Sequence, residues 1–158
     1  MNAQDREFML RAIELARAGM AANAGGPFGA IVVRDGKIIG EGNNRVTSSN
    51  DPTAHAEIIA IRQACGVLQS FQLDGCTIYT SCEPCPMCLG AIYWARPDRV
   101  VYACTREDAA IIGFDDDFIY SELKKANGDR AMVMMPLMRD EAMEVFTEWA
   151  EKPDKIEY

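Results

Sequence analysis

Long apolar runs are missing from this sequence. No stretch approaches the roughly 20 consecutive apolar residues that a membrane-spanning helix needs, so we expect neither a membrane span nor a membrane partner. The first residues, MNAQDREFMLRAIELARAGM, also lack the uninterrupted apolar core of a signal peptide, and we therefore expect a cytoplasmic protein. Internal repeats, low-complexity tracts and linkers are absent as well. Residues 1–158 are predicted to form a single domain.

Basic residues are scarce too. The chain has 16 lysines and arginines against 24 aspartates and glutamates, which gives a formal net charge of −8. Most non-specific affinity for nucleic acids comes from basic side chains that neutralise phosphates. The acidic balance therefore argues against a nucleic-acid partner and favours a small, neutral or weakly charged substrate.

Apolar periodicity and turn residues predict alternating helices and strands. Asp35-Gly36 separates two strand-like runs and is a strong hairpin signal. Asp51 and Pro52 suit the N-cap and the first position of a helix. Helices are predicted over 4–20, 51–66, 84–95, 116–125 and 140–152, and strands over 28–34, 37–42, 76–80, 99–103 and 131–137. This order implies an α/β protein whose sheet is covered by helices on both faces.

Three of the six cysteines lie in one short stretch, TSCEPCPMCLG. In a reducing compartment, clustered cysteines are more often metal ligands or catalytic thiols than disulfides. Cys85 and Cys88 lie three positions apart at a predicted helix start, where partial positive charge favours thiolates. An iron–sulfur run of the C-x2-C-x2-C-x3-C kind would need cysteine at position 92, which is Ile92. The remaining cysteines are interpreted as buried apolar residues: Cys65, Cys76, Cys82 and Cys104.

The one histidine, His55, completes a candidate zinc site. One imidazole with the thiolates of Cys85 and Cys88 supplies three tetrahedral ligands and leaves the fourth position for water. Such an open position is typical of catalytic zinc, which lowers the pKa of bound water towards about 7. Glu57 lies two residues past His55 and can reach that water without being a ligand. We predict one zinc ion per chain and Glu57 as the catalytic proton shuttle.

The pattern H-x-E followed by P-C-x-x-C is the signature of zinc nucleobase deaminases, and at these residues the chain resembles the cytidine deaminase superfamily. The resemblance implies a three-layer α/β/α sandwich around a five-stranded mixed sheet. Within the superfamily the chain is most similar to bacterial guanine deaminases, over GGPFGAIVV, TSSNDPTAHAE, TSCEPCPMCLGAIYWARP, GFDDDFIYSEL and the terminal tyrosine. The implied activity is zinc-dependent hydrolysis of guanine to xanthine and ammonia, in purine catabolism or salvage.

The same resemblance implies roles for side chains that would bind the base. Asn44 would hydrogen-bond the purine, and Phe28 would stack on it or pack against it. Asp116 would accept hydrogen bonds from guanine N–H groups. The run of three acids leaves Asp115 and Asp117 open for that contact, or for the ordinary place of acids at a helix start.

The resemblance also concerns assembly. Similar proteins are homodimers in which the C-terminal segment is exchanged, here about residues 140–158. Tyr158 would then close the pocket of the partner subunit rather than its own. A terminal aromatic residue is otherwise usually frayed or packed on the surface.

Other functions fit the same motifs. A tRNA adenosine deaminase shares the zinc motifs and the DPTAHAE context, although the acidic charge and a pocket-closing tail argue against RNA. Another free base, such as cytosine or a triazine, could be the substrate, because the motifs specify the chemistry better than the ring. A non-enzymatic zinc or iron–sulfur module remains a further alternative, which metal analysis distinguishes.

Overall fold

The fold is described from a computed structural model, which describes residues 3–114 and 116–158. The chain divides into two compact units, one up to Asp117 and one over Phe118–Tyr158. The first unit holds the entire sheet and the predicted metal ligands. The single domain expected over residues 1–158 stays a prediction.

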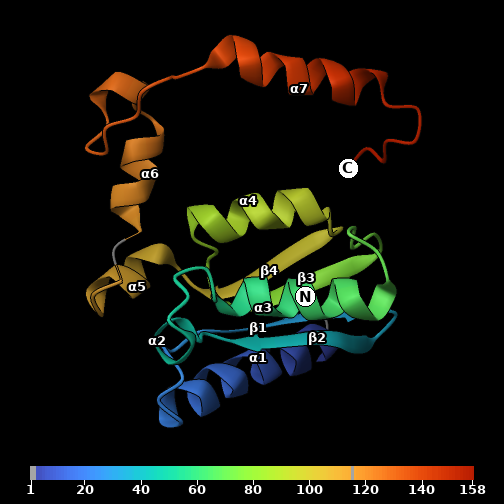
Figure 1. The fold of residues 1–158 in the computed structure, drawn as a ribbon. Coiled ribbons are helices and arrows are strands. Elements are labelled where there is room, and N and C mark those ends of the chain that lie inside the picture. Colours follow the sequence, from blue (N-terminus) through green and yellow to red (C-terminus); the bar gives the residue numbers. More distant parts are fainter. Residues whose placement is uncertain (1–2, 115) are drawn as a thin grey trace. The chain divides into compact units, whose positions relative to one another are not determined.

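The sheet has four strands in the order β2-β1-β3-β4 (Figure 1). Strand β1 pairs antiparallel with β2 and β3, whereas β3 and β4 run parallel. Asp35 and Gly36 have φ angles of 50° and 71°, as a two-residue type I′ turn requires, so the predicted hairpin is confirmed. The strands are β1 (Gly29–Arg34), β2 (Lys37–Asn43), β3 (Cys76–Cys82) and β4 (Arg99–Cys104).

The expected fifth strand is absent from the described residues. The predicted stretch 131–137 is extended or bent and pairs with no strand. Its side chains are exposed, with Val133 82% and Leu137 85% accessible. An apolar run indicates that a segment packs against another part of a protein, but it does not show that the packing partner is a neighbouring strand. The five-stranded sheet was therefore a wrong prediction for this chain.

Helices lie on both faces of the sheet in the first unit. Helix α1 (Ala3–Ala21) packs on one face, and α3 (Ala56–Leu68) and α4 (Pro86–Ala95) lie on the other (Figure 1). Strand β1 alternates between the two cores, as a strand covered on both sides must. Ala30 and Val32 join the core beneath α3, while Ile31 and Val33 join the core beneath α1.

A cluster of the buried Asp5 and Tyr79 with the exposed Arg99 attaches α1 to the sheet. The carboxylate of Asp5, 5% exposed, accepts hydrogen bonds from the Tyr79 hydroxyl at 2.6 Å and from Arg99 at 2.5 Å. Arg99 also donates to the Tyr79 oxygen at 3.1 Å. These contacts join the first turn of α1 to β3 and β4, and they satisfy a carboxylate that would otherwise be costly to bury.

The helix predicted to start at Asp51 starts later. The Asp51 carboxylate accepts hydrogen bonds from the backbone and side chain of Thr53, at 2.8 and 2.7 Å, and so forms a local turn. The N-cap of α3 is His55. The helices not yet bounded are α2 (Val46–Ser49), α5 (Arg106–Ile111), α6 (Asp117–Leu123), η1 (Asn127–Asp129) and α7 (Arg139–Glu151).

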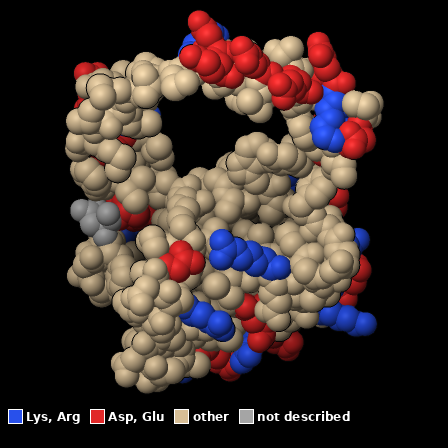
Figure 2. Space-filling model, in the orientation of Figure 1, with Lys and Arg blue, Asp and Glu red and all other residues tan. Residues whose placement is uncertain are grey.

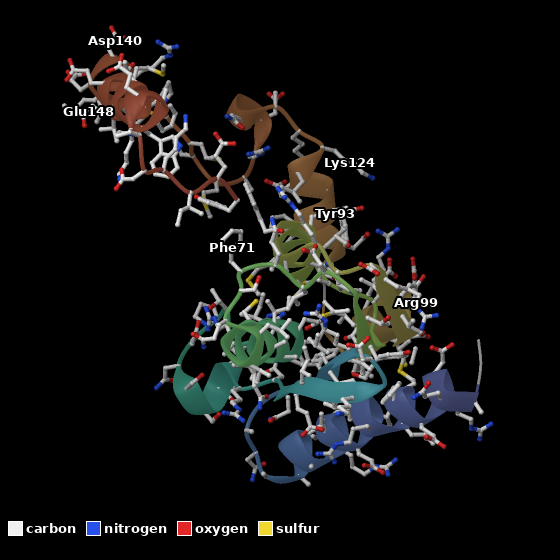
Figure 3. The ribbon with its side chains drawn as sticks, turned by 90° about the vertical axis from the view of Figure 1, so that its right-hand side faces the viewer. Phe71, Tyr93, Arg99, Lys124, Asp140 and Glu148 are labelled. Atoms are coloured by element: carbon white, nitrogen blue, oxygen red, sulfur yellow. The ribbon has the colours of Figure 1, made fainter. Side chains whose placement is uncertain are left out.

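The second unit is helical and has no core of its own. None of its residues is buried, and apolar side chains such as Phe146 and Val145 are more than half exposed. Helix α7 carries an acidic face, seen as red atoms in Figure 2, from which Asp140 and Glu148 are labelled in Figure 3. No helix within residues 3–114 and 116–158 is long and apolar enough to cross a membrane.

Two strand glycines let helices approach the sheet closely. A Cβ on Gly29 would lie 2.2 Å from the carbonyl oxygen of Ala12 in α1. A Cβ on Gly42 would lie 2.2 Å from the carbonyl oxygen of Ala56, in the first turn of α3. Backbone atoms cannot rotate away, so any side chain at either position would push a helix off the sheet.

We expect Gly29→Ala to lower the free energy of unfolding by about 2–3 kcal/mol, because α1 must shift to admit the methyl group. Urea denaturation measures this change. Gly66→Ala is the matched control: a Cβ there meets nothing within 4 Å, and Gly66 lies inside α3. That substitution should raise the free energy of unfolding by about 0.5–1 kcal/mol. Equal stability of Gly29→Ala and the wild type would contradict the close-approach argument.

Candidate functional site

The predicted metal ligands come from the starts of two helices. His55 is the N-cap of α3 and Cys85 the N-cap of α4, both with extended backbone. Neither side chain makes a capping hydrogen bond, so both are available for another partner. Cys88 lies one turn further along α4 and is fully buried. The helix N-termini place partial positive charge beside the thiols, which favours thiolates.

The three side chains have the spacing that zinc needs. His55 Nδ1 lies 3.6 Å from Cys85 Sγ and 3.5 Å from Cys88 Sγ. Tetrahedral zinc, with Zn–N of about 2.0–2.1 Å and Zn–S of about 2.3 Å, separates nitrogen and sulfur ligands by about 3.6 Å. Among the described residues these three form the one group that can hold a metal ion. The donor set of one imidazole and two thiolates therefore fits zinc.

The two thiols differ in acidity. The pKa of Cys85 falls to about 4, first because Cys88 donates a hydrogen bond to its sulfur and then because His55 does. The pKa of Cys88 is raised, because it keeps the shared proton and is buried. Cys85 is thus already a thiolate at neutral pH, and metal binding needs to displace only one thiol proton.

The third thiol of the C-x-x-C-x-x-C ladder does not join this group. Cys82 is 7% exposed at the end of β3, and its sulfur donates to the Thr105 carbonyl at 3.4 Å. Burial raises the pKa of Cys82 to about 12, which keeps it a neutral thiol. Its interpretation as a small buried residue is confirmed. Cys104, expected in the core, is exposed, so that prediction was wrong.

A buried carboxyl group lies beside the metal-ligand atoms. Glu57 is 7% exposed, and its Oε2 accepts from Cys88 Sγ at 3.5 Å. Its other oxygen, Oε1, accepts from the hydroxyl of Thr80, which lies on β3, at 3.3 Å. Burial raises the pKa of Glu57 above its usual range. A buried carboxyl group with a raised pKa beside metal-ligand atoms is a candidate for proton transfer.

Asn44 has an amide whose orientation is fixed by backbone donors. Its Oδ1 accepts from Gly26 N at 3.2 Å and from Val46 N at 3.1 Å, and the residue is 5% exposed. Since both bonds go to the oxygen, they identify which amide atom is which. The Nδ2 group is left as a donor that makes no hydrogen bond to any described residue.

Asp116 has an unsatisfied acceptor near the metal-ligand atoms. Its Oδ1 is buried and has no hydrogen-bond partner among residues 3–114 and 116–158. Burial raises the pKa of Asp116, and the negative charge of Cys85 raises it further. The negative charge of Asp116 also contributes to the raised pKa of His55, after the larger effect of the hydrogen bond to Cys85. A buried acceptor without a partner costs free energy unless something donates to it.

The other candidate residues are placed as follows. Phe28, partly buried, packs its ring against Phe114 with centroids 4.8 Å apart. Asp117 is exposed in the first turn of α6, the default place for such an acid. Asp115 lies outside the described residues, so its suggested contact is not tested. Tyr158 belongs to the second unit, and its relation to the metal-ligand group stays a prediction.

Sequence reasoning missed three contacts of this site. Thr80 follows Ile78 by two positions on β3, so period-2 alternation could have placed it on the α3 face beside Glu57. Glu83 accepts from the backbone N–H of Arg106 at 3.2 Å and so secures the start of α5. The contact of Phe114 had no signal, because no helix was predicted over the residues that form α5.

Comparison with known proteins agrees with this geometry. Residues 2–104 match the family described as the cytidine and deoxycytidylate deaminase zinc-binding region. The chain belongs to this deaminase family. It is 56% identical to a guanine deaminase of Bacillus subtilis over 96% of this chain and 97% of the relative. A solved structure of guanine deaminase from that organism matches with a TM-score of 0.95 at 54% identity, covering 100% of this chain and 99% of the other.

More distant members of the family carry other names. A tRNA-specific adenosine deaminase of Haemophilus influenzae is 41% identical over 72% of this chain and 68% of the relative. The family match and the TM-score confirm the cytidine deaminase-like α/β fold, with the sheet corrected to four strands. Zinc is accordingly the metal that the His55, Cys85 and Cys88 group is built to bind.

We expect Cys88→Ser to lower the zinc content from about one ion per chain to less than about a tenth of that after dialysis, because a serine hydroxyl stays protonated and binds zinc poorly. Elemental analysis by mass spectrometry measures the ratio. Cys104→Ser is the matched control, since its thiol is exposed and outside the group. Retention of full zinc content by Cys88→Ser, or its loss in Cys104→Ser, would contradict the ligand assignment.

Proposed function

We propose that this chain catalyses the zinc-dependent hydrolytic deamination of guanine to xanthine and ammonia. The observation that carries the proposal is the buried Glu57 carboxyl group in contact with the Cys88 sulfur of a zinc-ligand cluster. The 56% identity to the Bacillus subtilis guanine deaminase over nearly the whole chain supports guanine as the base. This reaction belongs to purine catabolism or salvage, and we propose that it occurs in the cytoplasm without a nucleic-acid or membrane partner.

The proposed mechanism assigns the proton transfers to Glu57. A zinc ion held by His55, Cys85 and Cys88 would lower the pKa of a bound water and so supply hydroxide near neutral pH. Glu57 takes one proton from that water and delivers it to a ring nitrogen, while the water oxygen bonds to C2, the amine-bearing carbon of guanine. Glu57 then takes the second proton from that oxygen and donates it to the amine, the bond between C2 and the amine nitrogen breaks, and ammonia leaves. Burial raises the pKa of Glu57, which suits a group that both accepts and donates protons.

Thr80 keeps Glu57 in place for these transfers. Its hydroxyl, 1% exposed, donates to Oε1 at 3.3 Å and leaves Oε2 on the side of the Cys88 sulfur. One carboxyl oxygen is therefore held by the protein while the other faces the metal-ligand atoms. Such a fixed geometry avoids the entropy loss of orienting a free side chain during the reaction.

Base discrimination is proposed to rest on Asn44 and Asp116. Guanine presents N1–H and amino donors beside the O6 acceptor, whereas adenine presents the reverse pattern at the corresponding ring positions. The orphan Asp116 Oδ1 can accept from guanine N–H groups, and the Asn44 Nδ2 can donate to an acceptor of the base. Adenine would leave these buried groups unpaired, which is the costly way to bind a wrong substrate. Phe28 supplies an aromatic surface for the ring.

Ammonia release tests the proposal directly. We expect the zinc-loaded protein to turn over guanine, and we expect Glu57→Gln to bind zinc normally while its turnover falls by about 100-fold or more, because the amide cannot carry a proton. The assay offers guanine, adenine, cytosine and a tRNA anticodon stem-loop in parallel. Zinc content is measured on the same samples, so loss of metal and loss of proton transfer are separated.

Other outcomes of this assay decide between the alternatives. Turnover of the RNA alone would favour tRNA deamination, and its rate should then fall steeply as salt rises. Turnover of cytosine alone would keep the zinc chemistry and reject the base assignment. Full activity of Glu57→Gln would reject the proposed role of that residue.

We also propose a homodimer in which the C-terminal segment, about residues 140–158, is exchanged and brings Tyr158 to the partner's site. The second unit supports this, because none of its residues is buried although many are apolar. The first unit exposes apolar side chains as well, with Tyr93 75% and Trp94 63% accessible on α4 (Figure 3). Exposed apolar patches of this extent mark interaction surfaces.

Exchange of the tail predicts complementation between two inactive chains. Glu57→Gln lacks the proton shuttle, and Tyr158→Ala lacks the tail side chain. Co-refolding equal amounts should restore about a quarter of the sites, because a mixed exchanged dimer holds one intact Glu57 beside one intact Tyr158. Light scattering should give twice the 17.5 kDa of one chain. A monomer, or a mixture no more active than the sum of its parts, would contradict the exchange.

A further inference from the structure

We propose that Phe114 is a positioning residue for the base. It connects the segment that orients Asn44 to the loop that carries Asp116, and so sets the spacing between the Asn44 donor and the Asp116 acceptor. The inference rests on the proposed function, because it concerns how that site selects its base. It also assigns a role to a residue outside the metal motifs. The argument begins with how Phe114 itself is held.

Phe114 is held by the C-terminal end of α5. Its backbone N–H donates to the Ala109 carbonyl at 3.1 Å, and the N–H of Gly113 donates to Ala110 at 3.0 Å. Gly113 has φ of 91°, a conformation that favours glycine and turns the chain out of the helix. The start of α5 is closed by a reciprocal capping box between Thr105 and Asp108. The ring thus stands at the end of a helix that is fixed at both ends.

The start of α5 is also tied to the metal-ligand loop. Glu83, two residues before Cys85, accepts from the backbone N–H of Arg106 at 3.2 Å. The N–H of Glu83 in turn donates to the Cys104 carbonyl at 2.8 Å. Movement of α5 would therefore strain the loop that precedes Cys85. These hydrogen bonds of Glu83 therefore hold Phe114 at a fixed distance from the metal-ligand group.

The Phe114 ring packs against the segment that precedes β1, at Gly26 and Phe28. Its centroid is 4.8 Å from that of Phe28, with the rings at 85°, an edge-to-face pair. The ring also touches the backbone of Gly26 so closely that a Cβ there would lie 2.9 Å from Phe114 Cζ. Phe28 is packed against the core on its other side. The Phe28 and Phe114 pair therefore connects the hydrophobic core to the C-terminal end of α5.

The same short segment that Phe114 touches also orients Asn44. Gly26 N donates to Asn44 Oδ1 at 3.2 Å, and Asn44 N donates to the Phe28 carbonyl at 3.0 Å. A shift of the segment would turn the amide. On the other side, Asp116 follows Phe114 by two positions and carries the orphan Oδ1. The Phe114 ring thus contacts the segment that orients the Asn44 amide, and Phe114 itself belongs to the loop that carries the Asp116 carboxylate.

This geometry makes a specific prediction for Phe114→Ala. KM for the base should rise about three- to tenfold, and the preference for guanine over adenine should fall, because donor and acceptor no longer keep one spacing. Zinc content should not change. Phe114→Leu, which keeps most of the apolar volume, should lie between the alanine variant and the wild type.

Gly26→Ala tests the contact between Gly26 and Phe114 from the other side. The new Cβ would press on Phe114 Cζ, so this substitution alone should also raise KM. In the Phe114→Ala background the two contacts with Phe114 are removed and only the 3.1 Å contact with Phe28 Cε2 remains, so adding Gly26→Ala should have a smaller effect than in the wild type. Non-additivity of this kind reports direct coupling between two positions. Phe71→Ala is the matched control, an exposed phenylalanine in the loop beyond the far end of α3 from His55 (Figure 3).

The outcomes separate this inference from the proposed function. The five variants (Phe114→Ala, Phe114→Leu, Gly26→Ala, the double variant and Phe71→Ala) and the wild type are assayed with guanine, adenine and cytosine, and KM and kcat are fitted for whichever base the wild type uses. If that base is cytosine, the proposed function fails while the coupling is still measured. Multiplicative effects of Gly26→Ala and Phe114→Ala, or a change confined to kcat, would overturn the inference. Absence of turnover with every base would overturn both.

Discussion

The close approach of α3 to β2 is the constraint on which the site depends. With no side chain at Gly42, the strand meets the backbone of Ala56 directly, between His55 and Glu57. The imidazole and the carboxyl group are therefore positioned by backbone contact rather than by flexible side chains. Ala60, fully buried one turn later, continues the same small-residue contact along the helix. A chain that packed α3 at the usual distance would move both groups away from the cysteines.

Charge in the site is balanced by backbone dipoles as much as by side chains. Cys85 is a thiolate, and Glu57 and Asp116 are acids pushed towards neutrality by burial. His55 is pushed towards the protonated form, mainly by its hydrogen bond to Cys85. The N-termini of α3 and α4 add two partial positive charges at the same place. These acidic groups can lie close together because the positive N-termini of α3 and α4, and a site suited to a divalent cation, offset their negative charge.

The cysteine pair of the metal-ligand set could be predicted from the sequence because its spacing is local, whereas His55, 30 positions before Cys85, was predicted with the deaminase signature. One turn of α4 brings Cys85 and Cys88 to one side, and the Asp35-Gly36 turn needs no tertiary information. The start of α3 was misplaced because Asp51 has two equivalent uses, as a helix cap or as a turn with Thr53, and packing decides between them. The prediction of a strand over 131–137 was wrong for a related reason. Apolar side chains need a packing partner, but they do not specify which element provides it. The contact of Phe114 with Phe28 joins distant segments, which no spacing encodes, whereas alternation along β3 predicts the face on which Thr80 lies but not its partner Glu57.

The Asp5, Tyr79 and Arg99 cluster bears on the order in which the chain folds. Asp5 meets Tyr79 across 74 positions and Arg99 across 94. Helix α1 precedes the strands of the sheet in the chain, yet the partners of its buried carboxylate belong to β3 and to β4, the last strand of the sheet. Contacts of such sequence separation carry a large loop-closure cost and form slowly. We therefore expect the amides of α1 to gain protection from hydrogen exchange late in refolding, after the hairpin that follows it in the chain.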